Sequence, residues 1–219
     1  MNEPSGFRIE DGERLVLSTN PFRFQYRDAV FFQEAAEKAV KTPLEPCYAR
    51  NSVLLFVLAM EALINRVLDR HIRMDFPAFL REKFLDLPLD MKWYMAPLWC
   101  SGDTKPSTYE IDKEPFQSFR ELIKIRNWYV HAKPERKPMK VISAQRGIVD
   151  YTDLNNLTWP QTKIPKDLNP FDKKCASKAK QVVDEMISLL DQFLGGKIKK
   201  DDWWLTETID KHPQKSTQA

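Results

Sequence analysis

The sequence predicts an all-α protein, an antiparallel helical bundle that carries one small β-hairpin and loop insertion near residues 139–170. Apolar residues recur at helical spacing through several long segments, and the stretch Ser52–Met60 is apolar on every side. The chain has 15 Pro and only 6 Gly, a balance typical of helices separated by proline-bearing connections. Its 219 residues suffice for one sizeable core, so we expect a single helical domain over residues 1–219.

The core of this domain is expected at about residues 22–195. Residues 1–20 lack a convincing period and predict an arm or a short extended piece. The polar residues 206–219 predict a mobile tail. No internal repeat divides the chain, so the sequence indicates one domain with two peripheral ends.

The first half of the chain predicts four helices. Residues 24–40 are amphipathic and are followed by Pro43, which ends the helix. Residues 48–72 contain almost no helix breaker, and their apolar centre predicts the central buried helix. Shorter helices are expected at 77–85 and, rich in aromatic residues, at 89–99.

The second half predicts two longer helices. Pro115 suits the first position of a helix that runs over residues 116–132, and Pro134 prevents its continuation. Residues 171–194 have apolar side chains at core spacing and are followed by Gly195-Gly196, a helix-ending pair.

The connection between these two helices changes character. Residues 140–151 contain two apolar runs around a Gln-Arg-Gly turn, which predicts a small β-hairpin. Residues 152–170 are rich in Asn, Thr and Pro and predict a long loop. We expect both segments to lie outside the helical bundle.

Composition and motifs exclude several classes of protein. The sequence is 42% hydrophobic and 30% charged, which is ordinary for a globular domain. The first residues show no signal peptide, and the longest uninterrupted apolar run, Val53–Met60, is shorter than the roughly 20 residues of a membrane span. We therefore expect a cytoplasmic protein that does not associate with a membrane.

The sequence gives no support for a metal or nucleotide cofactor. Cys47, Cys100 and Cys175 are widely separated, with no CxxC pair that would indicate a zinc ribbon or a disulfide framework. The chain contains no HExxH, GxxxxGK[ST], GxGxxG or GxSxG motif. We expect neither a metal nor a cofactor.

Positive charge is concentrated in one segment. Between Arg120 and Arg146 there are eight basic residues and two acidic ones, although the net charge of the whole chain is only +3. Such a patch is the electrostatic footprint of a phosphate-bearing partner, but charge alone favours the alternative of a solvated loop whose Lys residues keep the surface soluble. The candidate RNA-binding residues in this segment are Lys133, Arg136, Lys137 and Lys140.

Arg126, Asn127 and His131 form the candidate catalytic group. They occupy the last two turns of the predicted helix 116–132, with Asn127 and His131 on one face. A His that titrates near neutral pH can move a proton between a ribose 2′-hydroxyl and a leaving oxygen, and an Arg can hold the phosphate. The alternative is structural, because a His at a helix end is often only a cap.

The run from Arg126 to His131, followed by Ala132-Lys133-Pro134, resembles the R-x(4–6)-H signature of HEPN domains. Asn127 is the commonest polar residue after the Arg of that signature, and residues 60–65 resemble the family's preceding helix, in which a polar or acidic residue faces the motif. HEPN domains are small helical bundles found in RNA-cleaving toxins, phage-defence proteins and RNA-processing nucleases.

The resemblance implies a metal-independent endoribonuclease that acts as a homodimer on RNA, with an antitoxin or regulatory protein as a further partner. His131 would be the general acid and base, Arg126 the phosphate-binding group and Asn127 a positioning group. Glu61 and Asn65 would support them from the preceding helix, although a salt bridge from Glu61 to a neighbouring Arg explains that residue as well.

Two other readings remain open on the sequence. Some HEPN members bind without cutting, so the chain would also suit a non-catalytic module that binds RNA, a nucleotide or a protein. A helical interaction protein whose basic hairpin docks an acidic partner is the third reading.

Overall fold

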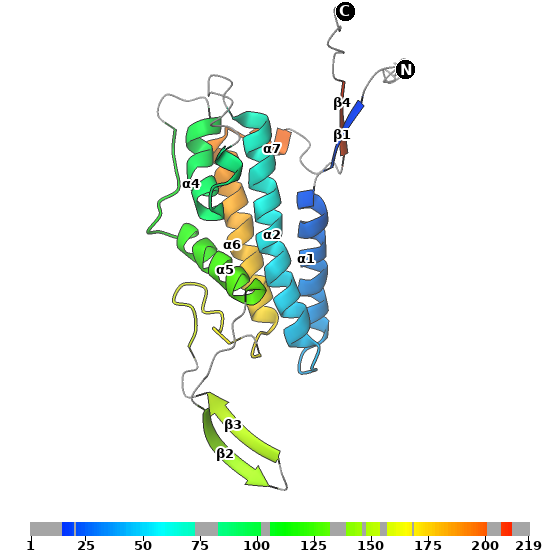
Figure 1. Cartoon of the computed structure of the whole chain (residues 1–219), viewed down its shortest axis with the longest axis vertical. Coiled ribbons are helices and arrows are strands. Elements are labelled where there is room, and N and C mark those ends of the chain that lie inside the picture. The colour runs from blue at the N-terminus through cyan, green and yellow to red at the C-terminus, as the bar shows by residue number, and fades with distance from the viewer. Residues whose placement is uncertain are drawn as a thin grey trace, which may run out of the picture.

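The computed structural model describes residues 15–19, 21–72, 83–101, 106–131, 139–145, 148–153, 157–167, 169–200 and 207–211; of the strands and residues 199–200 it describes the backbone only. The helices are α1 (Pro21–Lys38), α2 (Glu45–His71), α4 (Leu89–Cys100), α5 (Phe116–Val130), α6 (Lys173–Phe193) and α7 (Lys197–Lys200). The strands are β1 (Leu15–Thr19), β2 (Met139–Gln145), β3 (Ile148–Asp153) and β4 (Glu207–Lys211). The described residues are mainly helical, which confirms the all-α class (Figure 1).

The helix α2 is the central element of the bundle. It contacts α1, α4, α5 and α6, and side chains such as Val53, Phe56 and Leu63 have no exposed surface. By length and composition alone, α2 would be able to cross a membrane, and its apolar stretch is longer than the run Val53–Met60 suggests. Most of that stretch is buried among the other helices, and burial accounts for its apolar composition.

The helix α5 lies obliquely across α2 and α6 and also contacts α4 (Figure 1). Its apolar residues Phe119, Leu122 and Ile125 are buried at helical spacing, as the sequence predicts. The N–H of His131 donates to the carbonyl of Asn127 at 2.9 Å and closes the last turn. Because α2 and α6 also touch each other directly, α5 covers both helices without separating them.

The other helix boundaries differ from the prediction by a few residues. The helix α1 begins at Pro21, where the fixed φ of proline suits the first turn. Asp172 caps α6 by accepting a hydrogen bond from the N–H of Cys175 at 3.1 Å. Gly195 and Gly196 follow the helix with φ of 64° and 78°, a conformation that favours glycine. Of the short helix expected at 77–85, residues 83–85 are helical and 77–82 lie outside the described residues.

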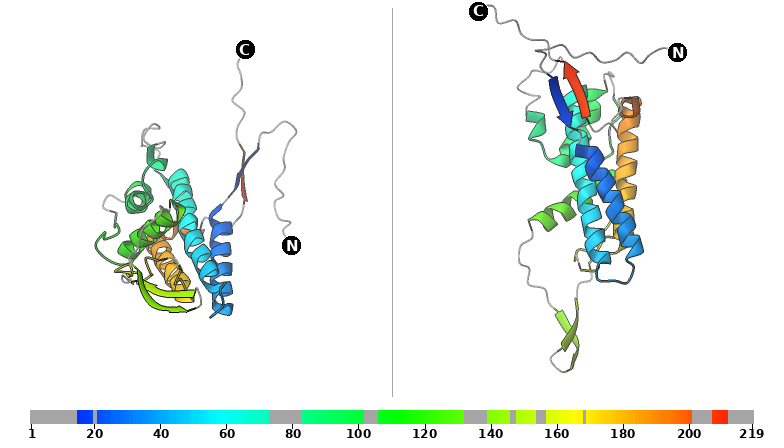
Figure 2. Two further views of the ribbon diagram at one scale, coloured as in Figure 1. Left: turned by 60° about the horizontal axis from the view of Figure 1, so that its bottom comes forward. Right: turned by 90° about the vertical axis from the view of Figure 1, so that its right-hand side faces the viewer.

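Strands β2 and β3 pair antiparallel within the segment where the sequence predicts a hairpin. Met139 lies opposite Asp153 and Gln145 opposite Ile148, with a register shift between Val141 and Ser143. The pair extends beyond the end of the bundle (Figure 2). Figure 2 also places strands β1 and β4 beyond the opposite end, near the start of α1.

Strand β4 lies within residues 206–219, which the sequence predicts to be a tail. Residues 207–211 form a strand antiparallel to residues 15–19, with Leu17 opposite Ile209. Pairing satisfies the backbone N–H and C=O groups of both segments. The two strands come from opposite ends of the chain, so no local pattern in either segment indicates the partner.

Candidate functional site

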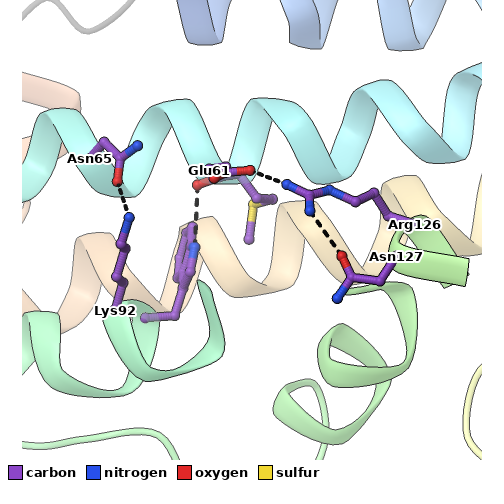
Figure 3. Close-up of polar contacts among 7 residues, drawn as sticks. Glu61, Asn65, Lys92, Arg126 and Asn127 are labelled. Atoms are coloured by element: carbon purple, nitrogen blue, oxygen red, sulfur yellow. Dashed lines mark hydrogen bonds and ion pairs between the residues drawn. The ribbon is translucent and has the colours of Figure 1, made fainter. Parts of the chain in front are cut away.

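The guanidinium of Arg126 lies between α5 and α2. It forms an ion pair with the carboxylate of Glu61 on α2, and its Nη1 donates to Oδ1 of Asn127 at 2.9 Å (Figure 3). The Arg126 side chain is 22% exposed and that of Glu61 36% exposed, so water reaches one side of the pair. The Nε of Arg126 is buried and has no hydrogen-bond partner among the described residues. One N–H on each terminal nitrogen therefore remains for another acceptor.

His131 is the residue directly after α5, and its side chain is exposed. Within the part of the chain that the structure describes, no hydrogen bond or ion pair joins its imidazole to Arg126. The structure thus brings Arg126 together with Asn127 and Glu61, and leaves His131 one helical turn beyond Asn127. The imidazole is free to meet a ligand from solvent.

Asn65 lies one turn further along α2 than Glu61 and contacts a different residue. Its Oδ1 accepts a hydrogen bond at 2.8 Å from Nζ of Lys92 on α4 (Figure 3). Lys92 is only 4% exposed, and burial lowers the pKa of its ammonium, while the Glu61 carboxylate opposes that shift. Asn65 therefore supports Lys92 and does not touch the Arg126 guanidinium.

The candidate RNA-binding residues of the basic segment lie mostly beyond what is described. Lys133, Arg136 and Lys137 are outside the described residues. Lys140 lies in β2 opposite Thr152, and only its backbone is described. The described basic residues near the motif are others, on α5 itself.

Residues Arg120, Lys124, Asn127 and His131 form one exposed row along α5, which we call the α5 row. Arg120 pairs with Asp90 of α4 at 3.4 Å. Lys124 lies two turns before His131 and faces the loop 157–167, where its Nζ is 6.0 Å from the ring centre of Trp159. The α5 row presents positive charge and the imidazole on the same side of the helix.

Three residues of this region were not predicted as site residues: Lys92, Glu121 and Trp159. Lys92 and Glu121 are charged residues at positions where α4 and α5 are otherwise buried. A charged residue at a helix position that the apolar periodicity assigns to the core would have indicated both residues, because buried charges need partners. Trp159 carries no such signal, since it lies in a loop whose folding depends on contacts distant in sequence.

Two observations bear on metals and thiols. Among the described residues, no cluster of three or more His, Cys, Asp or Glu side chains is placed to hold a metal ion. Burial raises the pKa of both Cys100 and Cys175 to about 12, which keeps these thiols protonated at neutral pH. Protonated, buried thiols are poor nucleophiles and poor metal ligands.

No family model, curated protein or solved structure matches the chain. Function is therefore inferred from the residues of the site and from the resemblance of the motif to the HEPN signature.

Proposed function

We propose that this protein is a metal-independent endoribonuclease of HEPN type, with a HEPN-like arrangement of α2, α5 and α6. The observation that supports it is an exposed His131, one turn beyond Asn127, on the same helix as an Arg126 whose direction is fixed by Glu61 and Asn127. Metal-independent RNA cleavage uses a group that holds the phosphate and an accessible acid and base, and Arg126 and His131 are side chains of these two types.

In this proposal, His131 takes the proton from a ribose 2′-hydroxyl, and the 2′-oxygen attacks the adjacent phosphorus. The bond from phosphorus to the 5′-oxygen breaks, and the imidazolium returns the proton to that oxygen. The product strand then ends in a 2′,3′-cyclic phosphate. The remaining N–H groups of Arg126 hold the phosphate oxygens, and Asn127 keeps the guanidinium in place.

The proposal includes a two-fold dimer in which both motifs line one cleft. Val130, directly before His131, is 57% exposed and offers an apolar contact beside the motif. The positive charge of two adjacent α5 rows is screened beyond about 8–10 Å at ordinary ionic strength and is neutralised when RNA lies between them. Sedimentation at tens of micromolar should give a dimer, and a monomer with and without RNA would contradict the shared cleft.

In the cell, we propose a cytoplasmic toxin or phage-defence nuclease held in check by an antitoxin or regulatory protein. RNA is the substrate, and no cofactor takes part in the reaction.

A second candidate is a non-catalytic module that binds RNA, a nucleotide or a protein. The observation that favours it is the direction of Arg126, which is paired with Glu61 and does not contact His131. In that case the ion pair serves the packing of α5 on α2, and His131 is a surface residue.

Incubation of the purified protein with single-stranded RNA distinguishes the two candidates. The nuclease should cut in the presence of EDTA and leave 2′,3′-cyclic phosphate ends. RNA that remains intact across a range of sequences, while still bound, would support the non-catalytic module.

A further inference from the structure

The loop 157–167 has a defined fold of its own. The N–H of Trp159 donates to the carbonyl of Ile164 at 2.8 Å, and the N–H of Lys163 donates to the carbonyl of Trp159 at 2.9 Å. Thr158 and Pro165 form an antiparallel bridge, and Lys163 turns the chain with φ of 60°. These bonds make a tight hairpin-like turn in which the position of Trp159 is set by the backbone.

The carboxylate of Glu121 fastens this turn to α5. It accepts the N–H of Gln161 at 3.0 Å, the N–H of Thr162 at 2.8 Å and the Thr162 hydroxyl at 3.0 Å. Glu121 is only 5% exposed, so these donors satisfy a charge that water does not reach. The loop is therefore a built part of the α5 surface.

The turn holds Trp159 so that two lysines lie beside its ring, one from α5 and one from the loop itself. Nζ of Lys124 on α5 is 6.0 Å from the ring centre, and Nζ of Lys166 on the loop is 5.2 Å away. The indole is half-buried and packs against the edge of the core, which leaves part of it open to solvent. Ile164 beside it is 1% exposed and anchors the turn from below.

This arrangement lies in line with the candidate catalytic group. Lys124 and His131 are seven residues apart in the α5 row, which corresponds to about 10 Å along the helix axis. About three stacked nucleotides cover that length, at 3.4 Å each. A strand bound at His131 would therefore reach Trp159 within a few nucleotides.

We propose that Trp159, Lys124 and Lys166 form a subsite that binds one base and its flanking phosphates in single-stranded RNA. The choice of RNA as the ligand rests on the proposed function. A base stacks on the exposed part of the indole, and the two ammonium groups contact the flanking phosphates. A base stacked on an aromatic side chain interacts more strongly with the ring than an exposed ammonium does. The base therefore displaces the ammonium from the ring, and the ammonium gains a phosphate.

The test measures affinity for a short single-stranded RNA with 2′-O-methyl riboses, which cannot be cut through the 2′-hydroxyl. Trp159→Leu keeps an apolar side chain in the turn and removes the ring face, so affinity should fall about fivefold to a hundredfold. Trp159→Tyr keeps a ring and should retain most of the affinity. Lys124→Ala and Lys166→Ala should each reduce the salt dependence of log K by about 0.7, and Lys38→Ala on α1 should leave it unchanged.

An RNA with abasic residues distinguishes loss of base stacking on Trp159 from loss of the packing of Trp159 within the protein. Wild-type protein should bind it more weakly, and Trp159→Leu should then cause no further loss. If Trp159→Leu and Trp159→Tyr bind as wild type does, or if Trp159→Leu weakens intact and abasic RNA equally, the subsite is wrong.

The outcome is distinguishable from that of the nuclease proposal. If Trp159→Leu, Lys124→Ala and Lys166→Ala all cleave RNA as wild type does, the subsite is wrong and the nuclease proposal stands. Binding that depends on Trp159 in a protein that cuts no RNA would support the subsite and overturn the nuclease. Binding of an acidic peptide in place of RNA, lost in the same variants, would overturn the choice of ligand.

Discussion

Glu61 decides where Arg126 points. Its carboxylate is the acceptor on α2 toward which the guanidinium turns, and Lys92 supplies a second positive charge one turn away. The ion pair is partly open to water, so its contribution to stability is expected to be modest and its main effect to be the direction of Arg126.

Glu61→Gln should therefore lower RNA cleavage more than it lowers stability. The amide keeps an acceptor for Arg126 but removes the charge that holds it, so the free energy of unfolding should fall by about 1 kcal/mol or less. Cleavage should fall by about tenfold or more, because the phosphate-binding group is no longer fixed. Single-turnover cleavage and urea unfolding measure the two effects.

Glu110→Gln is the matched control for this change. It breaks an ion pair with Lys113 in which both side chains are about two-thirds exposed, and it should leave cleavage unchanged. Equal losses of activity in the two variants, or no loss in Glu61→Gln, would contradict a positioning role for Glu61.

The sequence indicates candidate residues for this site but does not give their contacts. The spacing of Asn127 and His131 and the position of Glu61 in an apolar helix indicate candidates. Which Arg reaches Glu61 depends on how α5 crosses α2, and that crossing is set by packing across the whole bundle. For the same reason, the bond between Asn65 and Lys92 could not be read from either helix alone.

At the scale of elements, α5 has three roles. Its apolar side packs on α2 and α6, its α5 row faces solvent, and Glu121 holds the loop 157–167. The loop in turn places Trp159 beside Lys124. The buried carboxylate of Glu121 thus holds the loop 157–167, which follows the β2–β3 hairpin, beside the α5 row.

Glu121→Gln should release the loop from α5. The amide NH2 would face backbone N–H donors, and buried donors left without a partner cost about 1–3 kcal/mol. We expect the free energy of unfolding to fall by that amount and the amides of Gln161 and Thr162 to exchange with deuterium faster. Glu185→Gln, an exposed change on α6, is the control, and unchanged exchange at Thr162 would contradict the account.

The long helices were predictable because their signals are local. The apolar stretch of α2 and the core spacing of α6 before Gly195-Gly196 depend only on neighbouring residues. The pairing of β1 with β4 depends on two segments at opposite ends of the chain, and neither has a strong strand pattern. The fold of the loop 157–167 depends on Glu121, about forty residues earlier in the chain.

At the scale of the molecule, several buried groups give up protons only at high pH. Burial raises the pKa of Cys100 and Cys175 from 9.0 to about 12 and raises that of Tyr26 and Tyr109 above the ordinary value of 10.0. The unfolded chain loses these protons first, so their contribution to stability is complete below pH 9 and declines above it. Lys92, whose pKa is lowered, acts in the opposite sense up to its ordinary value of 10.5.

The free energy of unfolding should therefore fall as pH rises from 9 to 11. Each thiol contributes a slope of at most about 1.4 kcal/mol per pH unit. Urea unfolding of Cys100→Ala/Cys175→Ala should give a smaller slope than wild type, whatever its stability at pH 7. Identical slopes in the two proteins would show that the thiols titrate alike in the folded and unfolded chains.

The most direct test of the proposed nuclease compares wild type with His131→Ala in cleavage, RNA affinity and stability. His131 is exposed, so the free energy of unfolding should change by no more than about 0.5 kcal/mol. RNA affinity should stay within about twofold, and the rate of cleavage should fall about 10²- to 10⁴-fold, the usual contribution of a general acid and base. His212→Ala is the control for the loss of a histidine and should cleave as wild type does. If His131→Ala cleaves as fast as wild type, or if it loses activity only because it unfolds, His131 is not the catalytic base and the central claim is wrong.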